Sequence, residues 1–288
     1  SILAAEGGNI ASLDRVYVKT SLDMTYLFEI DSTENIEIKN SFFNMKIPEA
    51  DYPNLEHVIK ISETELNLNI DNLTIVNAIT QSGAIELIFQ RVNPGVKIAN
   101  SYFKNNKIVG GNGAAINIQY TKAGTYLFKK NTFENNQAIV YHSAGGKGGA
   151  LYLSSSTEAP IYSIVDCSFK FNHADLYAGA IYIYGVPPTF TSTDFVGNTA
   201  GEIENDIGSY AIKLKKIKKS TVASRLLEEK SYIPDLNSTE TITIDHIGSN
   251  LEISDDFELA LVDMYGQPVL DDSSSSLQII STDSNIKS

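Results

Sequence analysis

The residues with acid, base or metal-binding chemistry are scattered along this chain of 288 residues. Its four histidines, with no spacing typical of a metal site, are His57, His142, His173 and His246. Four aspartates stand at unequal distances from their nearest phenylalanine, namely Asp166, Asp175, Asp194 and Asp206. The single cysteine, Cys167, cannot form an internal disulfide, and its place beside Phe169 favours an inert, half-buried thiol. We therefore expect no catalytic residue, no metal ion and no cofactor.

Many of these residues lie within a repeated motif. The second half of the motif is a Gly-Ala-Ile/Leu tripeptide, or a variant of it, that opens a short apolar segment. Its copies are Gly83-Ala84-Ile85, Ala114-Ala115-Ile116, Gly149-Ala150-Leu151, Gly179-Ala180-Ile181 and the degraded Tyr210-Ala211-Ile212. Successive alanines are 31, 35, 30 and 31 residues apart. Such a period is typical of repeat architectures, in which each unit buries its apolar face only by stacking on a neighbour.

The first half of the motif is Phe-x-x-Asn. Its four copies are Phe103 to Asn106, Phe133 to Asn136, Phe169 to Asn172 and Phe195 to Asn198. A constant spacing of 30 residues from Phe43 through Leu73 to Phe103 extends the register upstream. We predict that the phenylalanines fill an interior and that the asparagines form a ladder from coil to coil, a structural role rather than a catalytic one.

Apolar and polar residues alternate after each alanine, as in Ile116-Asn117-Ile118. This period of two indicates strands with one apolar face, and aligned repeats give continuous aliphatic columns. The pattern predicts an all-β fold, a right-handed parallel β-helix of coils of about 30 residues over residues 1–215. A β-sandwich or a propeller would fit the strand content but not the spacing, since propeller repeats usually run to about 40 residues or more.

One column of these strands faces outward and could carry chemistry. It is predicted to consist of Glu86, Asn117, Tyr152, Tyr182 and Lys213. A single acid does not supply the carboxylate pair of a glycoside hydrolase. Tyr152 and Tyr182 are expected to stack on successive coils, either as an exposed platform for sugars or another protein, or simply as a cross-strand pair that stabilises the sheet.

The order Phe-x-x-Asn and then Gly-Gly-Ala-Ile/Leu resembles the repeats of the polymorphic outer membrane proteins of chlamydial surface autotransporters. Large surface proteins of some protists carry similar repeats, and the wider grouping is the pectin-lyase-like β-helix. The resemblance covers roughly residues 30 to 215 and is specific in four units. It implies a surface or secreted protein, typically an adhesin or an extracellular structural segment. Because the wider grouping includes polysaccharide lyases and hydrolases, a carbohydrate-active enzyme is an alternative.

The residues after the repeats change in character. A basic run contains Lys215, Lys216, Lys218 and Lys219. It is interpreted either as a solvated edge or as a contact for an acidic neighbour or polyanionic glycan. Residues 216–240 are expected to form a linker or cap with a short helix at 225–230. Residues 241–288 are acidic and contain strand-like segments that resemble the opening of a small β-sandwich module.

Composition limits the classes of function. A formal net charge of -13 argues against nucleic-acid binding, because a phosphate backbone repels an acidic surface. The sequence contains no stretch of about 18 apolar residues, so it predicts no membrane-spanning segment. Two glycosylation sequons begin at Asn72 and Asn237, and Asn237 is the more credible acceptor. We expect a non-enzymatic extracellular or cell-surface protein, structural or adhesive, whose partners are further copies in a head-to-tail filament, other extracellular proteins or glycans. The alternative is a β-helix that binds or processes polysaccharide.

Overall fold

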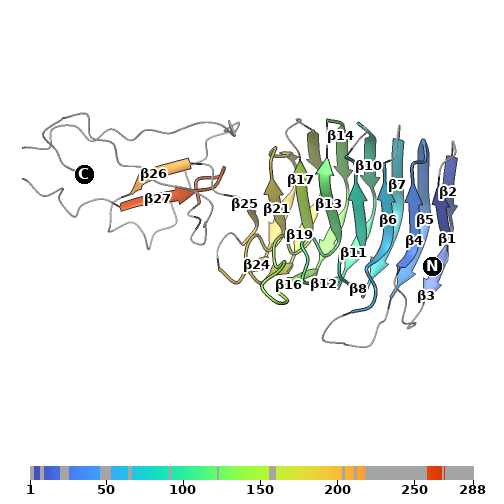
Figure 1. The fold of residues 1–288 in the computed structure, drawn as a ribbon, viewed down its shortest axis with the longest axis horizontal. Helices are drawn as coiled ribbons and strands as arrows, with labels where there is room; N and C mark the ends of the chain where they lie inside the picture. The colour runs from blue at the N-terminus through green and yellow to red at the C-terminus, as the bar shows by residue number, and fades with distance from the viewer. Residues whose placement is uncertain are drawn as a thin grey trace, which may run out of the picture. The chain divides into compact units, whose positions relative to one another are not determined.

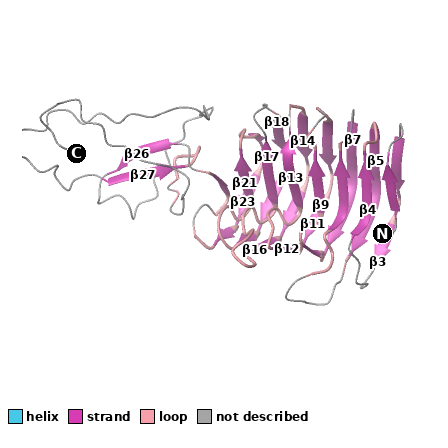
Figure 2. Cartoon of the chain, in the orientation of Figure 1, coloured by secondary structure: helices cyan, strands magenta, loops and turns pink. Residues whose placement is uncertain are grey.

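The computed structural model describes residues 3–6, 10–19, 26–45, 53–63, 67–90, 93–121, 123–155, 160–202, 205–210, 213–217, 258–267 and 269. Contacts divide the chain into two compact units, Ser1–Ser209 and Tyr210–Ser288, whereas the sequence placed the end of the repeats at residue 215. The secondary structure of the described residues is all strand, without a helix (Figure 1, Figure 2). The first unit is a parallel β-helix, as its repeats predicted.

Three parallel sheets form this β-helix, because each coil adds its strands beside those of the coil before. The first sheet has eight strands: β1 (Leu3–Glu6), β4 (Tyr26–Asp31), β6 (His57–Ser62), β9 (Ile85–Ile88), β13 (Ile116–Thr121), β17 (Leu151–Ser155), β21 (Ile181–Tyr184) and β25 (Ile207–Ser209). The third sheet has five short strands: β8 (Ile79–Thr80), β12 (Lys107–Val109), β16 (Gln137–Ile139), β20 (His173–Ala174) and β24 (Thr199–Ala200).

The second sheet is the largest, with twelve strands, and it bends where one strand of a coil gives way to the next. Its strands are β2 (Ile10–Asp14), β3 (Tyr17–Lys19), β5 (Asn35–Asn44), β7 (Asn67–Val76), β10 (Gly95–Ala99), β11 (Tyr102–Lys104), β14 (Thr125–Lys129), β15 (Thr132–Glu134), β18 (Ile161–Val165), β19 (Ser168–Lys170), β22 (Thr189–Thr191) and β23 (Asp194–Val196). The two described strands of the second unit, β26 (Lys213–Ile217) and β27 (Glu258–Val262), pair antiparallel.

Register between coils explains why the Gly-Ala-Ile motif recurs. Ile85, Ile116, Leu151, Ile181 and Ile207 are direct partners on successive strands of the first sheet. The first four of these side chains are fully buried, and removing such a side chain from water contributes roughly 1.5–3 kcal/mol. The repeated alternation therefore places one aliphatic residue per coil in the same interior column.

Two details of the predicted register are wrong. The strand that follows β21 in the first sheet is β25, where Tyr182 pairs with Gly208, while the predicted partner Lys213 pairs with Val262 of the second unit. Ala211 and Ile212 of the degraded copy lie outside the described residues. Upstream, Phe43 pairs with Ile75, not with Leu73. A constant spacing of 30 residues fails here because the coil that joins β5 to β7 is longer.

The phenylalanines of Phe-x-x-Asn stack along the interior of the coils. The ring centroids of Phe103 and Phe133 lie 5.2 Å apart, those of Phe133 and Phe169 4.7 Å, and those of Phe169 and Phe195 5.2 Å. Their planes differ by 6–10°, so the rings are stacked face to face. Aromatic pairs of this kind add stability beyond the area that they bury.

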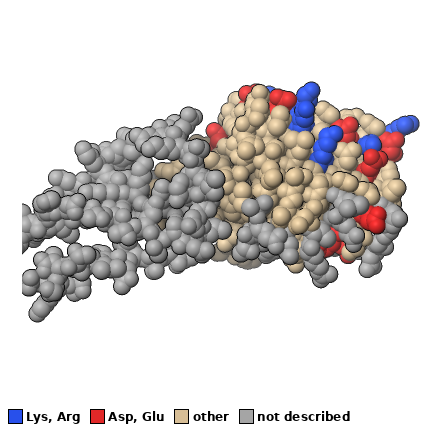
Figure 3. All heavy atoms as spheres, turned by 90° about the horizontal axis from the view of Figure 1, so that it is seen from above, with Lys and Arg blue, Asp and Glu red and all other residues tan. Residues whose placement is uncertain are grey.

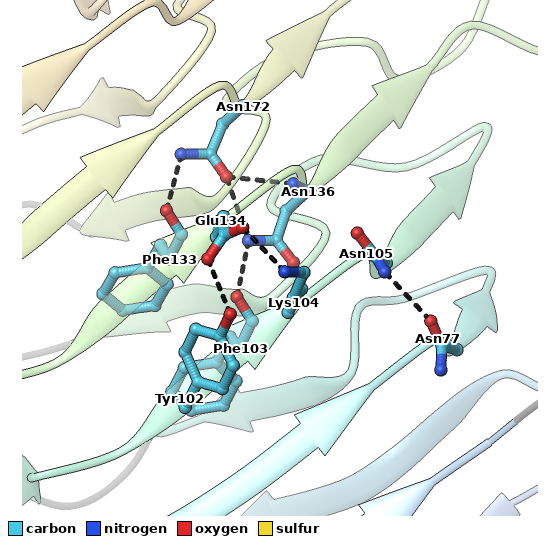
Figure 4. A network of polar contacts seen from close by, with 9 residues as sticks. All are labelled: Asn77, Tyr102, Phe103, Lys104, Asn105, Phe133, Glu134, Asn136 and Asn172. Atoms are coloured by element: carbon cyan, nitrogen blue, oxygen red, sulfur yellow. Dashed lines mark hydrogen bonds and ion pairs between the residues drawn. The ribbon is translucent and has the colours of Figure 1, made fainter.

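The asparagines of the motif lie at the bend that follows, and their amides are bonded from coil to coil (Figure 4). Asn106 Nδ2 donates to Asn136 Oδ1 at 3.0 Å, and Asn136 Nδ2 donates to Asn172 Oδ1 at 2.9 Å. The same nitrogen of Asn136 donates to the carbonyl of Phe103 at 3.1 Å, while its oxygen also accepts from the backbone N–H of Asn106 at 3.2 Å. Each amide thus closes the backbone bend of the coil before it. Asn172 Nδ2 continues the column to Asn198 Oδ1 at 2.9 Å.

Left-handed backbone conformations mark the bends next to this ladder. Asn77, Asn105 and Asn135 have φ between 53° and 60°, a region that asparagine tolerates better than other side chains. Phe171 occupies the equivalent place one coil later, with φ 55° and a side chain that is 56% exposed. A bulky residue in this conformation carries a local backbone cost of about 1–2 kcal/mol.

Candidate functional site

A groove of about 500 Å³ lies on the outer side of the first sheet, where the turn from β12 leads into β13. Its lining combines amide side chains, tyrosines, serines and glycine backbone: Gln81, Ser82, Gly110, Gly111, Asn112, Asn117, Gln119, Tyr152, Ser154 and Tyr184. None of these residues carries a formal charge. Volumes of this size are usual for small-molecule sites.

The wall of the groove is built by a close approach of two glycine segments. A side chain at Gly145 would place its Cβ only 2.4 Å from the backbone of Gly110 and Gly111, so glycine is required there. Gly146 N–H donates to Gly111 O at 2.9 Å, and Lys147 N–H donates to Asn112 Oδ1 at 3.0 Å. The coil of 35 residues therefore uses its extra length to hold Asn112 in the groove wall.

The amides of the floor each donate one hydrogen bond to the protein. Asn117 Nδ2 donates to the carbonyl of Ser82 at 3.1 Å, and Gln119 Nε2 donates to Glu86 Oε1 at 3.3 Å. Asn117 is only 3% exposed, and its Oδ1 is buried without a hydrogen-bond partner among the described residues. A buried acceptor of this kind is costly unless water or a ligand satisfies it.

The two predicted tyrosines are stacked but differ in exposure. Tyr152 and Tyr182 are direct partners on β17 and β21, with ring centroids 5.8 Å apart and planes 3° apart. Tyr152 is half-buried and lines the groove. Tyr182 is only 4% exposed, because Tyr177 packs against it and Lys147 Nζ lies 5.1 Å from its ring centroid. The exposed tyrosine of this face is Tyr184, at 50%, which the sequence reading did not single out although it follows Tyr182 at the strand period of two.

Charged residues gather on the coils upstream of the groove. Glu86 has Lys60 as its partner on β6, and Lys60 Nζ forms an ion pair with Glu29 Oε1 at 3.1 Å. Burial raises the pKa of Glu86, which is 7% exposed. His57 Nδ1 lies 3.7 Å from Glu86 Oε2, and burial lowers the pKa of His57 to about 4. The sequence named His57 only as one of four scattered histidines and did not single out Glu29 or Lys60, because their coils lack the Gly-Ala-Ile motif.

This charged group contains one carboxylate and one imidazole close together, yet neither lines the groove. Their side chains are 10% and 2% exposed, and the separation of 3.7 Å exceeds a hydrogen bond. Within the described ranges no cluster of three or more His, Cys, Asp or Glu side chains could hold a metal ion. The lining of the groove is therefore uncharged, and the buried pair lies outside it.

The face shown in Figure 3 carries both signs of charge towards the N-terminal coils and is mostly uncharged over the middle coils. Among the other predicted residues, Asn72 lies on β7, is exposed and donates to Asn40 Oδ1 at 3.0 Å. Lys215 and Lys216 belong to β26, but their side chains lie outside the described residues. Also outside them are Lys218, Lys219, Asn237, His246 and the expected helix at 225–230.

The remaining polar candidates have local structural partners. Asp206 Oδ1 accepts a hydrogen bond from Asn198 Nδ2 at 2.9 Å and so ends the ladder. Asp175 Oδ2 accepts from the backbone N–H of Val140 at 2.8 Å. Cys167 is buried, and that burial raises the pKa of its thiol. These contacts match stabilising roles for the three side chains.

Comparisons with protein-family models, with curated proteins and with solved structures give no match to this chain. No helix in the described part of the chain has the length and hydropathy needed to cross a membrane.

Proposed function

We propose that this chain is a rigid, non-enzymatic segment of a surface or secreted protein and that it binds carbohydrate in the groove of its first sheet. The observation that carries the proposal is the groove itself, with an uncharged lining of amides, hydroxyls and tyrosines on a solenoid. Sugars offer hydroxyls to amides and apolar ring faces to aromatic side chains, and both kinds of partner lie side by side here.

The solenoid suits a binding surface that must keep its shape. The asparagine ladder and the stacked phenylalanines tie each coil to the next, including the coils that carry the groove. Sites built on such elements lose less conformational entropy on binding than sites on loops. This supports an adhesive role in which the β-helix presents the groove.

Binding without turnover is favoured over catalysis by the position of the acidic group. Glu86 contacts the lining through the hydrogen bond that it accepts from Gln119, yet it is buried and forms no part of the lining. Glycoside hydrolysis needs two carboxyl groups facing the scissile bond. The proposal therefore assigns Glu86 to holding Gln119 and not to chemistry on a sugar.

A glycan array with the purified chain, followed by titration calorimetry of each hit, tests this function. We expect saturable binding that Tyr184→Ala weakens about fivefold or more, since stacking on an exposed tyrosine contributes on the order of 1 kcal/mol or more. Tyr17→Ala is the matched control, because Tyr17 is 69% exposed on another part of the unit. An array without hits would refute the proposal, and release of shortened products that stops in Glu86→Gln would establish the enzymatic alternative.

Assembly into a head-to-tail filament is a second candidate, favoured by the two ends of the β-helix. The interior columns that begin at Leu13 and Val18 end, strand by strand, at Phe190 and Phe195, and all four side chains are half-buried. Another copy placed end to end would continue both columns in register. Negative-stain electron microscopy over a range of concentrations tests this: ordered filaments support it, and single short rods at every concentration refute it.

A further inference from the structure

The groove has a hydrogen-bonding polarity that its composition does not reveal. Three of its amides donate through their side-chain nitrogens to protein acceptors: Gln81 to the carbonyl of Pro53 at 2.7 Å, Asn117 to the carbonyl of Ser82, and Gln119 to Glu86. Each of these nitrogens gives one of its two hydrogens to the protein, and each amide oxygen keeps its capacity to accept. The lining therefore offers three amide oxygens as acceptors.

Asn117 shows this polarity most directly. Its Oδ1 is buried and has no hydrogen-bond partner among the described residues, and its side chain forms part of the groove lining. A ligand hydroxyl that donates to this oxygen would remove the cost of the unpaired acceptor. The carboxylate or sulfate group of an acidic sugar could not do so, because it presents only acceptors, and such a sugar could reach this oxygen only through its hydroxyls.

The charges around the groove act in the same direction. The buried carboxylate of Glu86 lies directly behind Gln119. Lys60 is paired with Glu29, and Lys147 Nζ lies over the rings of Tyr177 and Tyr182 at 5.2 and 5.1 Å. The lining itself holds no lysine or arginine, the residues that usually pair with acidic groups.

We propose that the groove selects uncharged sugars through their hydroxyl donors and excludes uronic-acid and sulfated glycans. This inference rests on the proposed function and deepens it by naming the ligand class. Among the contacts of the described residues, Asn112 is the one groove amide whose oxygen accepts from the protein, through the N–H of Lys147, and its Nδ2 remains a donor. It supplies a donor at one wall, opposite in kind to the acceptors of the floor.

The test compares ligands that differ in charge but not in backbone. Hexagalacturonic acid and its fully methyl-esterified form are titrated into the chain, together with cellohexaose and chitohexaose as further uncharged hexasaccharides. We expect at least one uncharged ligand to bind, the ester to bind at least tenfold more tightly than the acid, and Asn117→Ala to weaken the uncharged ligand about tenfold. Tyr17→Ala is again the control and should leave all affinities unchanged.

Two further variants make the result decisive. Gln81→Ala removes a half-buried acceptor, so it tests the same polarity if Asn117→Ala unfolds. Ser82→Lys introduces a cation into the lining and should reverse the preference in favour of the acid. Tighter binding of the acid by the unaltered chain, or unchanged affinity for uncharged ligands in both amide variants, would overturn the inference.

The outcomes also separate this inference from the function beneath it. Binding of acidic glycans that is lost in Tyr184→Ala would leave the groove a carbohydrate site and refute only its selectivity. Absence of binding by all four hexasaccharides and on the array would refute both proposals.

Discussion

Replacing Asn136 by alanine should destabilise the β-helix far more than its size suggests. The side chain is fully buried and takes part in four hydrogen bonds, two donated by Nδ2 and two accepted by Oδ1. Alanine would leave unpaired the backbone N–H and one side-chain N–H of Asn106, and it would remove one hydrogen bond from the carbonyl of Phe103. Each such buried group costs about 1–3 kcal/mol, and allowing for relaxation we expect a total loss of about 3–6 kcal/mol.

Native-state hydrogen exchange measured by mass spectrometry is the suitable assay, because a repeat protein need not unfold in one step. Protection should fall most in peptides that cover 103–106 and 133–136. Asn105→Gly is the matched control: Asn105 is exposed, has φ 54°, and makes one bond to Asn77 Oδ1 at 3.2 Å. We expect the control to cost less than about 0.5 kcal/mol. A loss below about 1 kcal/mol for Asn136→Ala, or one equal to the control, would refute the role given to the ladder.

Three further predictions concern single residues. Because His57 has a pKa of about 4 in the fold against 6.5 unfolded, its contribution to stability is complete above pH 6.5 and is lost as the pH falls towards 4, a change of about 3 kcal/mol. Denaturant titrations of wild type and His57→Leu over this pH range should show the difference. The raised pKa of Glu86 changes stability in the opposite sense, but it is common to both chains. If the free energies of unfolding of the two chains changed with pH in parallel, the lowered pKa of His57 would be contradicted. Phe171→Asn should relieve up to about 1–2 kcal/mol of backbone cost and should therefore raise the melting temperature. A clear decrease in melting temperature would mean that the packing of the phenylalanine ring contributes more than the backbone conformation costs. Gly148→Ala should lower the free energy of unfolding by at least about 2 kcal/mol, because φ is 64° and the new Cβ would lie 2.1 Å from Leu151 O. Unchanged stability in thermal denaturation would show that this turn can shift.

The core could be predicted from the sequence because it repeats. One aliphatic residue, one phenylalanine and one asparagine per coil occupy equivalent places, so spacing alone reveals columns such as Phe103 to Phe133. Where a coil changes length or its motif decays, spacing misleads. Ile75 took the place expected for Leu73, and β25 took the place expected for residues 210–212.

The groove could not be predicted in the same way, since its residues come from the parts of each coil that do not repeat. Gln81 and Asn112 belong to turns, and Asn112 is held by the N–H of Lys147 from the glycine-rich segment of the next coil. The strand alternation did place Asn117 and Tyr152 on the outer face. It could not show that Tyr182 is covered, because Tyr177 and Lys147 come from irregular segments.

The ladder joins residues that lie 26 to 36 positions apart in the sequence, one coil to the next. Such a chain can begin to fold before its C-terminal coils are present, because each folded coil presents strand edges on which the next coil can form. Growth can therefore run in one direction as synthesis proceeds. If the chain is threaded through a pore, every coil that folds on the far side would keep the chain from moving back through the pore. Folding would then drive export in one direction.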